Sequence, residues 1–141
     1  GDVLYNNINT KLLKSFSYSE KIFYIGDRPL IINDTVKNNI ELFNTIKNNN
    51  FGKFFKEKEL SSKISLYTLS QGEKIKLCLE RLYTNKFQGI ILIDEPTANL
   101  DIETKNILLN ELKILKKNNF IFVTTHDQDI VKISESIIKI G

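Results

Sequence analysis

Two adjacent carboxylates at the end of an apolar run are the residues of this sequence best suited to chemistry. Asp94 and Glu95 directly follow four aliphatic residues, Ile90 to Ile93. Such a run predicts a strand buried between two layers, as in a parallel sheet covered by helices, which binds ligands where its strands end. Carboxylates beside a buried strand are costly unless a cation, hydrogen-bond donors or water compensate their charge. Asp94 could support Mg²⁺ while Glu95 polarises a water for attack on a phosphate; the alternative is a plain acidic turn.

The only histidine lies in an equivalent position. His126 follows a second apolar run, Phe120 to Thr124. A lone histidine is more often a solvated or structural residue. The carboxyl ends of parallel strands meet at one edge of a sheet, however, so His126 and the acidic pair would face the same ligand.

A third candidate site lies at the start of a predicted helix. Apolar residues recur at helical spacing and predict a helix from about Gln71 to about Tyr83: Ile75, Cys78, Leu79 and Leu82. Ser70 and Glu73 make a complete capping box in front of it. The same helix start would suit an anion, because its backbone N–H groups are free and Gly72 permits close approach. The sequence leaves both interpretations open.

Strands and helices are predicted to alternate along the chain. Strands are expected at 2–5, 21–25, 90–93, 120–124 and 136–140. Helices are expected behind Asp34 as N-cap, over 51–58, over 71–83, behind Asp101 as N-cap, and over 128–134, with 60–68 irregular. The β-α-β-α-β order of the second half implies a parallel sheet with right-handed crossovers.

Composition places limits on the protein class. The chain has 141 residues, enough for one domain with a real core, and its 41% hydrophobic and 26% charged content is that of a globular protein. No run approaches the ~20 apolar residues of a membrane span, and no signal-peptide pattern opens the chain. The net charge of +3 comes from scattered lysines, which argues against a nucleic-acid surface. Cys78 lacks a disulfide partner and is expected to be a core thiol.

In order and spacing, the motifs together resemble the C-terminal half of an ATP-binding cassette (ABC) ATPase domain. They are L-S-Q-G-E at 69–73, I-I-L-I-D-E-P at 90–96, A-N-L-D at 98–101 and the strand that ends before His126. Upstream, 29–40 resembles the segment after the Q-loop of exporters that fuse membrane and ATPase domains, and 1–9 resembles a β-subdomain strand.

The resemblance implies an α/β fold of the P-loop NTPase (RecA-like) type. Its parallel sheet would have helices on both faces, would be incomplete, and would carry a small helical subdomain. The implied parts are a β-subdomain and Q-loop region at 1–33, a reduced helical subdomain at 34–68, and a core at 69–141 with the signature, Walker B, D-loop and switch histidine.

The resemblance also implies roles for individual residues. Glu95 would be the catalytic glutamate and His126 the switch histidine, while Asp94, the Walker B aspartate, would support Mg²⁺ through water. The signature residues would cover ATP held by a partner domain, and the D-loop Asp101 would lie at the dimer interface: Ser70, Gln71, Gly72 and Glu73 form that signature.

The implied parent is a transport ATPase at the cytoplasmic face of a membrane. It would bind ATP and Mg²⁺ and transfer a phosphoryl group to water. Its expected partners are a second ABC ATPase domain, paired head to tail, and the transmembrane domain of a transporter. The 141-residue chain itself is expected to be soluble.

Several departures from the family pattern carry expectations of their own. No G-x-x-x-x-G-K-[ST] loop and no methionine occur, so we expect a processed chain or a fragment that is inactive alone. Asp27 stands at the Q-loop glutamine position. Gln71 replaces a more usual glycine and Glu73 a more usual glutamine, which predicts weaker ATP binding at this half-site. Without the phosphate-loop strand, 120–124 would be an exposed sheet edge and 136–140 would lose its neighbour.

Two alternatives to a transport ATPase remain. One is an ABC-type ATPase of DNA repair or chromosome maintenance. Such proteins have long coiled coils before the signature, whereas the sequence between Asp27 and Leu69 contains no sustained heptad repeat, which argues against this alternative. The other is a degenerate, non-hydrolytic partner domain. Asp27 and the altered signature favour it, whereas the acidic pair and His126 oppose it.

Overall fold

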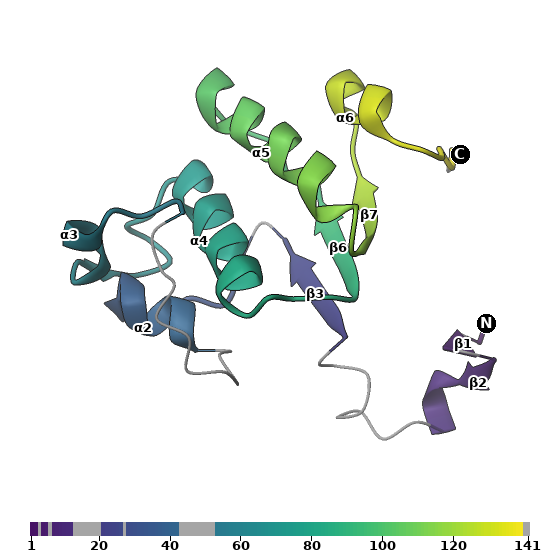
Figure 1. Cartoon of the computed structure of the whole chain (residues 1–141), viewed down its shortest axis with the longest axis horizontal. Helices are drawn as coiled ribbons and strands as arrows, with labels where there is room; N and C mark the ends of the chain where they lie inside the picture. The colour runs from purple at the N-terminus through teal and green to yellow at the C-terminus, as the bar shows by residue number, and fades with distance from the viewer. Residues whose placement is uncertain (3, 6, 13–20, 27, 43–52, 140–141) are drawn as a thin grey trace.

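A computed structural model describes residues 1–2, 4–5, 7–12, 21–26, 28–42 and 53–139 of the chain (Figure 1). Asp27, at the predicted Q-loop position, lies outside these described residues. Part of the predicted helix over 51–58 and the end of the predicted strand over 136–140 also lie outside them. Within the described residues, no helix is both long enough and apolar enough to cross a bilayer.

Three parallel strands form the central sheet: β3 (Ile22–Ile25), β6 (Ile90–Asp94) and β7 (Phe120–Thr124). Their order is β3-β6-β7, so the strand with the acidic pair lies in the middle (Figure 1). The register places Asp94 opposite Thr124, the last residue of β7. The predicted parallel sheet is therefore confirmed, and β7 is an edge strand of the described sheet, as expected.

Three helices follow the strands and enclose the main core: α4 (Gln71–Thr84), α5 (Ile102–Leu115) and α6 (Gln128–Ile133). Each begins at an N-cap whose side chain accepts a backbone hydrogen bond, and these N-caps are Ser70, Asp101 and Asp127. The core contains alternate sheet residues and the apolar faces of α4 and α5: Ile25, Ile75, Cys78, Leu79, Leu82, Ile91, Ile93, Leu108, Leu112 and Leu115.

The opposite face of the sheet is open in the part of the chain that the structure describes. Because strand side chains alternate, Tyr24, Phe120 and Phe122 point away from this core, and they are 60%, 75% and 56% exposed. The α/β class and the parallel sheet agree with the sequence, but the predicted second layer of helices is not present among the described residues. The reason is that α4, α5 and the partly buried Ile133 of α6 all pack on one apolar cluster.

A smaller unit packs on α4. It contains α2 (Val36–Glu41), α3 (Glu57–Leu60) and an antiparallel pair of short strands, β4 (Asp34–Thr35) and β5 (Lys63–Ile64). Its core consists of residues from α2, from β5, from the segment before α3 and from α4: Val36, Ile40, Phe55, Ile64 and Leu77. The domain boundaries predicted around it stay a prediction.

Local details of this smaller unit correct three sequence predictions. Thr35, not Asp34, caps α2, because the helix begins at Val36 and Thr35 Oγ1 accepts from Asn38 N at 3.1 Å, whereas Asp34 Oδ1 accepts from Thr35 N. The helix predicted over 51–58 begins only at Glu57, and β5 lies in a stretch predicted to be irregular.

The two ends of the described chain differ in structure. At the N-terminus, β1 (Leu4–Tyr5) and β2 (Ile8–Asn9) form an antiparallel pair followed by the 3-10 helix η1 (Thr10–Leu12). The strand predicted over 136–140 is wrong for its described part, since 136–139 form no strand. Ile137 and Ile138 remain exposed there because no described strand lies beside them to pair.

Candidate functional site

The acidic pair and His126 lie together at the C-terminal edge of the sheet. Glu95 N donates to the Thr124 carbonyl oxygen at 3.0 Å, which joins the ends of β6 and β7. The Thr124 hydroxyl donates to Asp94 Oδ1. His126 Nε2 lies 3.6 Å from Glu95 Oε1. Residues 30 positions apart in the chain thus converge on one edge, where a ligand of a parallel sheet is expected.

This edge is open to solvent. The His126 side chain is 98% exposed and that of Glu95 is 42% exposed. Their contact is an ion pair only when the imidazole is protonated, and at such exposure it contributes little to stability. Both groups are therefore accessible to a ligand and to water, as acid–base or charge-stabilising groups must be.

The backbone of Glu95 is strained. Its φ is 43°, in the left-handed region that costs a non-glycine residue about 1–2 kcal/mol. The conformation is held on both sides, because Glu95 N donates to Thr124 and the Glu95 carbonyl accepts from Ala98 N at 3.2 Å. Strain of this kind is concentrated at functional sites, which supports a role for the Glu95 carboxylate.

The donor set at this edge suits a cation held mainly by a phosphate ligand. Among the described residues, no group of three or more His, Cys, Asp or Glu side chains could hold a metal ion. Asp94 is exposed and hydrogen-bonded by Thr124. Mg²⁺ commonly takes one or two carboxylates and completes its shell with water and substrate phosphates. Asp94 therefore fits a supporting role towards Mg²⁺ and does not form a metal cage.

The predicted signature residues occupy the N-terminus of α4. Glu73 N donates to Ser70 Oγ at 3.2 Å, and Glu73 Oε2 accepts from Ser70 N and from Ser70 Oγ, both at 2.8 Å. The capping box predicted from the sequence is therefore confirmed, with Gln71 and Gly72 in its first turn. An anion bound here would compete with the Glu73 carboxylate for the Ser70 donors.

The signature glycine contacts the helix that follows Asp101. A Cβ atom at Gly72 would lie 3.1 Å from Thr104 Oγ1 and 3.2 Å from Thr104 Cγ2. Thr104 is buried and doubly bonded to Asp101, through N to Oδ1 and Oγ1 to Oδ2, each at 2.8 Å. The backbone bond from Thr104, followed by its side-chain bond, lowers the pKa of Asp101. The structure thus brings Gly72 and Asp101 together through Thr104.

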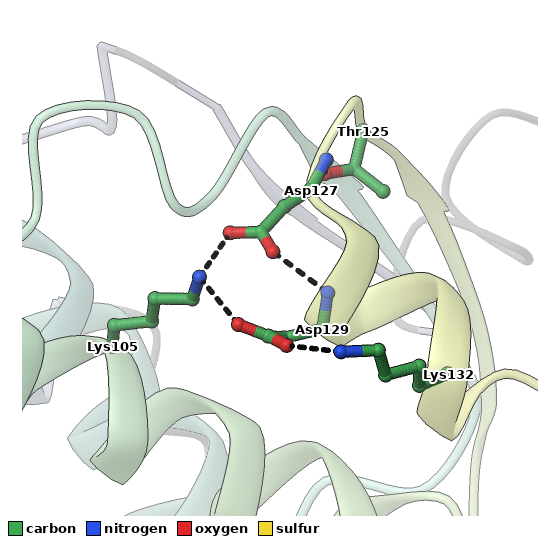
Figure 2. Close-up of polar contacts among 5 residues, drawn as sticks. All are labelled: Lys105, Thr125, Asp127, Asp129 and Lys132. Atoms are coloured by element: carbon green, nitrogen blue, oxygen red, sulfur yellow. Dashed lines mark hydrogen bonds and ion pairs between the residues drawn. The ribbon is translucent and has the colours of Figure 1, made fainter.

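Sequence reasoning missed several polar residues around His126. The Thr124 hydroxyl donates a hydrogen bond to Asp94. Asp127 caps α6 and forms an ion pair with Lys105 of α5 (Figure 2). The T-T-H-D pattern contains Thr124 and Asp127 and could have indicated them. No sequence signal identifies Lys105, because its contact depends on how α5 and α6 pack.

Comparisons with known proteins agree with the motifs. No protein-family model matches the chain. It is 27% identical over 148 residues to the lipoprotein-releasing system ATP-binding protein LolD of Buchnera aphidicola, covering 94% of this chain and 64% of the relative. It is 34% identical over 128 residues to the zinc import ATP-binding protein ZnuC of Wigglesworthia glossinidia brevipalpis, covering 88% of this chain. The chain spans only 53% of ZnuC.

A relative from DNA repair and a solved exporter are also similar. The Rad50 ATPase of Methanococcus maripaludis is 38% identical over 79 residues, which cover 52% of this chain and 8% of Rad50. A bacterial Atm1-family ABC exporter with ATP bound superposes with a TM-score of 0.75 at 16% identity. That match covers 96% of this chain and 26% of the exporter chain, and at this identity it establishes the fold. Over most of its length, the chain is thus similar to ATP-binding proteins of ABC transporters, and it shares the fold of an ABC exporter.

Proposed function

We propose that this chain supplies the catalytic edge of a transport ATPase. The observation that carries the proposal is the convergence of Asp94, Glu95 and His126 at the ends of two adjacent parallel strands. A carboxylate for a metal, a carboxylate for a water and an imidazole for developing charge are the groups that phosphoryl transfer to water requires.

Each of these side chains has a distinct role in the proposed reaction. Glu95 orients the attacking water by accepting a hydrogen bond from it, while His126 donates a hydrogen bond to the oxygen on which negative charge develops. Asp94 supports Mg²⁺, which when bound would neutralise phosphate charge. The Thr124 hydroxyl fixes the Asp94 carboxylate, and the strained backbone of Glu95 fixes the position of its side chain.

The phosphate cradle must come from outside these 141 residues, because no phosphate-loop motif occurs among them. We therefore propose that the chain alone hydrolyses little ATP. The proposed assembly is a head-to-tail pair of ABC domains on the cytoplasmic face of a membrane, bound to a transmembrane domain. Similarity to LolD, to ZnuC and to the fold of an exporter supports this assignment.

A second candidate, an ATPase of DNA repair, is favoured by the similarity to Rad50. Against it, the described chain between β3 and α4 contains only the short helices α2 and α3, where a coiled coil would need long apolar heptads. A non-hydrolytic partner domain gains support from Glu73, whose carboxylate occupies the Ser70 donors. The similarity to transporter ATP-binding proteins extends over more of the chain, so transport is preferred.

ATP turnover tests the proposal. The chain is compared with a version preceded by a phosphate-loop segment, each as wild type and as Glu95→Gln. We expect turnover only in the extended protein, a decrease of about 10²–10⁴-fold on Glu95→Gln, and retained ATP binding. Hydrolysis by the 141-residue chain alone, or unchanged turnover in the variant, would contradict the assignment of Glu95.

A further inference from the structure

Lys105 of α5 lies between two carboxylates at the start of α6. Its Nζ is 2.7 Å from Asp127 Oδ2 and 2.8 Å from Asp129 Oδ2 (Figure 2). The Lys105 side chain is 26% exposed and that of Asp127 is 16% exposed, so this is not a fully solvated contact. One ammonium group thus bridges the N-cap carboxylate of another helix and a carboxylate of its first turn.

Asp127 is the residue immediately after His126, and its contacts fix the chain at that point. Its N–H donates to Thr125 Oγ1 at 3.0 Å, and its Oδ1 accepts from Asp129 N at 2.8 Å as the cap of α6. The bond with Lys105 is the largest cause that lowers the pKa of Asp127, and a side-chain bond with Thr97 adds to it. His126 is therefore flanked by residues held from α5, from α6 and from the loop after Glu95.

The charges explain why a lysine is needed. Asp127 and Asp129 are two residues apart, and both carboxylates approach the same ammonium group. Without that cation they would repel each other, and the partial positive charge of the helix start would compensate only in part. Lys132 is no substitute, since its described ion pair is with Asp129 alone, at 3.1 Å, and its side chain is 73% exposed.

Lys105 also connects this loop to the helix that follows the acidic pair in the chain. It lies one turn into α5, whose N-cap is Asp101. We propose that Lys105 is a positioning residue that fixes the His126 loop to α5, so that His126 is held beside Glu95. The inference depends on the proposed function for its catalytic meaning, but its geometry can be tested without ATP.

Nuclear magnetic resonance provides the test, because His126 is the only histidine of the chain. Histidine-labelled protein is compared as wild type, Lys105→Met and Lys105→Arg, with Lys132→Met as the matched control. We expect Lys105→Met to shift and broaden the imidazole signals and to lower the His126 backbone order parameter from about 0.85 towards 0.6 or below. Lys105→Arg, which keeps the charge, should restore the wild-type spectrum, and Lys132→Met should match wild type.

Wild-type signals and order in folded Lys105→Met would overturn the proposal, as would an equal effect in Lys132→Met. If Lys105→Met does not fold, Asp127→Asn removes the carboxylate charge that Lys105 contacts next to His126, while an asparagine can still cap α6, and it should shift the same signals; no shift there would also overturn the proposal. Because no nucleotide is added, loss of ATP turnover for another reason leaves this readout unaffected. Failure of the proposed function and failure of this inference are thus distinguishable.

Discussion

Substitution of Gly72 by alanine tests why the signature helix contains a glycine at this position. An added Cβ would approach Thr104 Oγ1 to 3.1 Å and Cγ2 to 3.2 Å, closer than ordinary contact. Thr104 cannot easily withdraw, because it is buried and both its N and its Oγ1 are bonded to Asp101 at 2.8 Å. The structure therefore gives Gly72 a packing role in addition to the phosphate approach expected from the sequence.

Two opposing contributions determine how much Gly72→Ala changes the free energy of unfolding. Alanine is better than glycine in a helix by about 1 kcal/mol, whereas overpacking a fixed neighbour costs about 1–3 kcal/mol. We expect Gly72→Ala to lower the free energy of unfolding by about 0–2 kcal/mol. In a Thr104→Ala background both close atoms are gone and only Thr104 Cβ remains, at an ordinary 3.6 Å. There, Gly72→Ala should stabilise the protein by up to about 1 kcal/mol.

Urea denaturation of the wild type, the two single variants and the double variant measures the coupling between the two sites. We expect a coupling free energy of about 1–3 kcal/mol in favour of the double variant. If Gly72→Ala has the same effect in both backgrounds to within about 0.5 kcal/mol, the contact with Thr104 does not explain the glycine. ATP binding by the extended protein then separates the two roles, because only a requirement for phosphate approach would persist in the double variant.

Two further predictions concern the core thiol and the open sheet face. Burial raises the pKa of Cys78 to about 11 from 9.0, so at pH 8 the folded protein contains about a hundredfold less thiolate and should react with iodoacetamide far more slowly than the protein in urea. Because the unfolded thiol loses its proton first, stability should fall as the pH rises from about 9 to about 11; equal alkylation rates with and without urea would refute the burial argument. We predict that the exposed aromatic side chains of the open face make the chain self-associate in light scattering. Phe122→Ser should reduce this predicted self-association and change the free energy of unfolding by less than about 0.5 kcal/mol, because Phe122 is 56% exposed. Unchanged self-association would show that another surface is responsible.

The sequence predicted elements whose signals are local. The runs that form β6 and β7 are continuous and apolar, and the caps Ser70 and Asp101 stand directly before α4 and α5. The β-α-β alternation then implied parallel strands, and the carboxyl ends of such strands bring the acidic pair and His126 to the same edge. The core of the site was predictable because parallel strands all end on one side of a sheet.

Features that depend on a distant partner could not be predicted in this way. Ser136 to Ile140 has the apolar content of a strand, but a strand needs a neighbour, and the described part has none. The sequence also does not reveal whether helices cover one face of the sheet or both, since β7 has apolar residues on both of its faces. The contact of Lys105 with Asp127 depends on the packing of α5 against α6.

The left-handed backbone at Glu95 means that stability and chemistry favour different residues at one position. Glycine adopts a φ of 43° without the steric cost that glutamate bears. A search for more stable variants would thus favour Glu95→Gly, and the protein it selected would have lost the carboxylate proposed to activate water. The proposed activity therefore requires a residue that the backbone disfavours at this position, and a library of stabilised variants should be tested for ATP turnover before it is used.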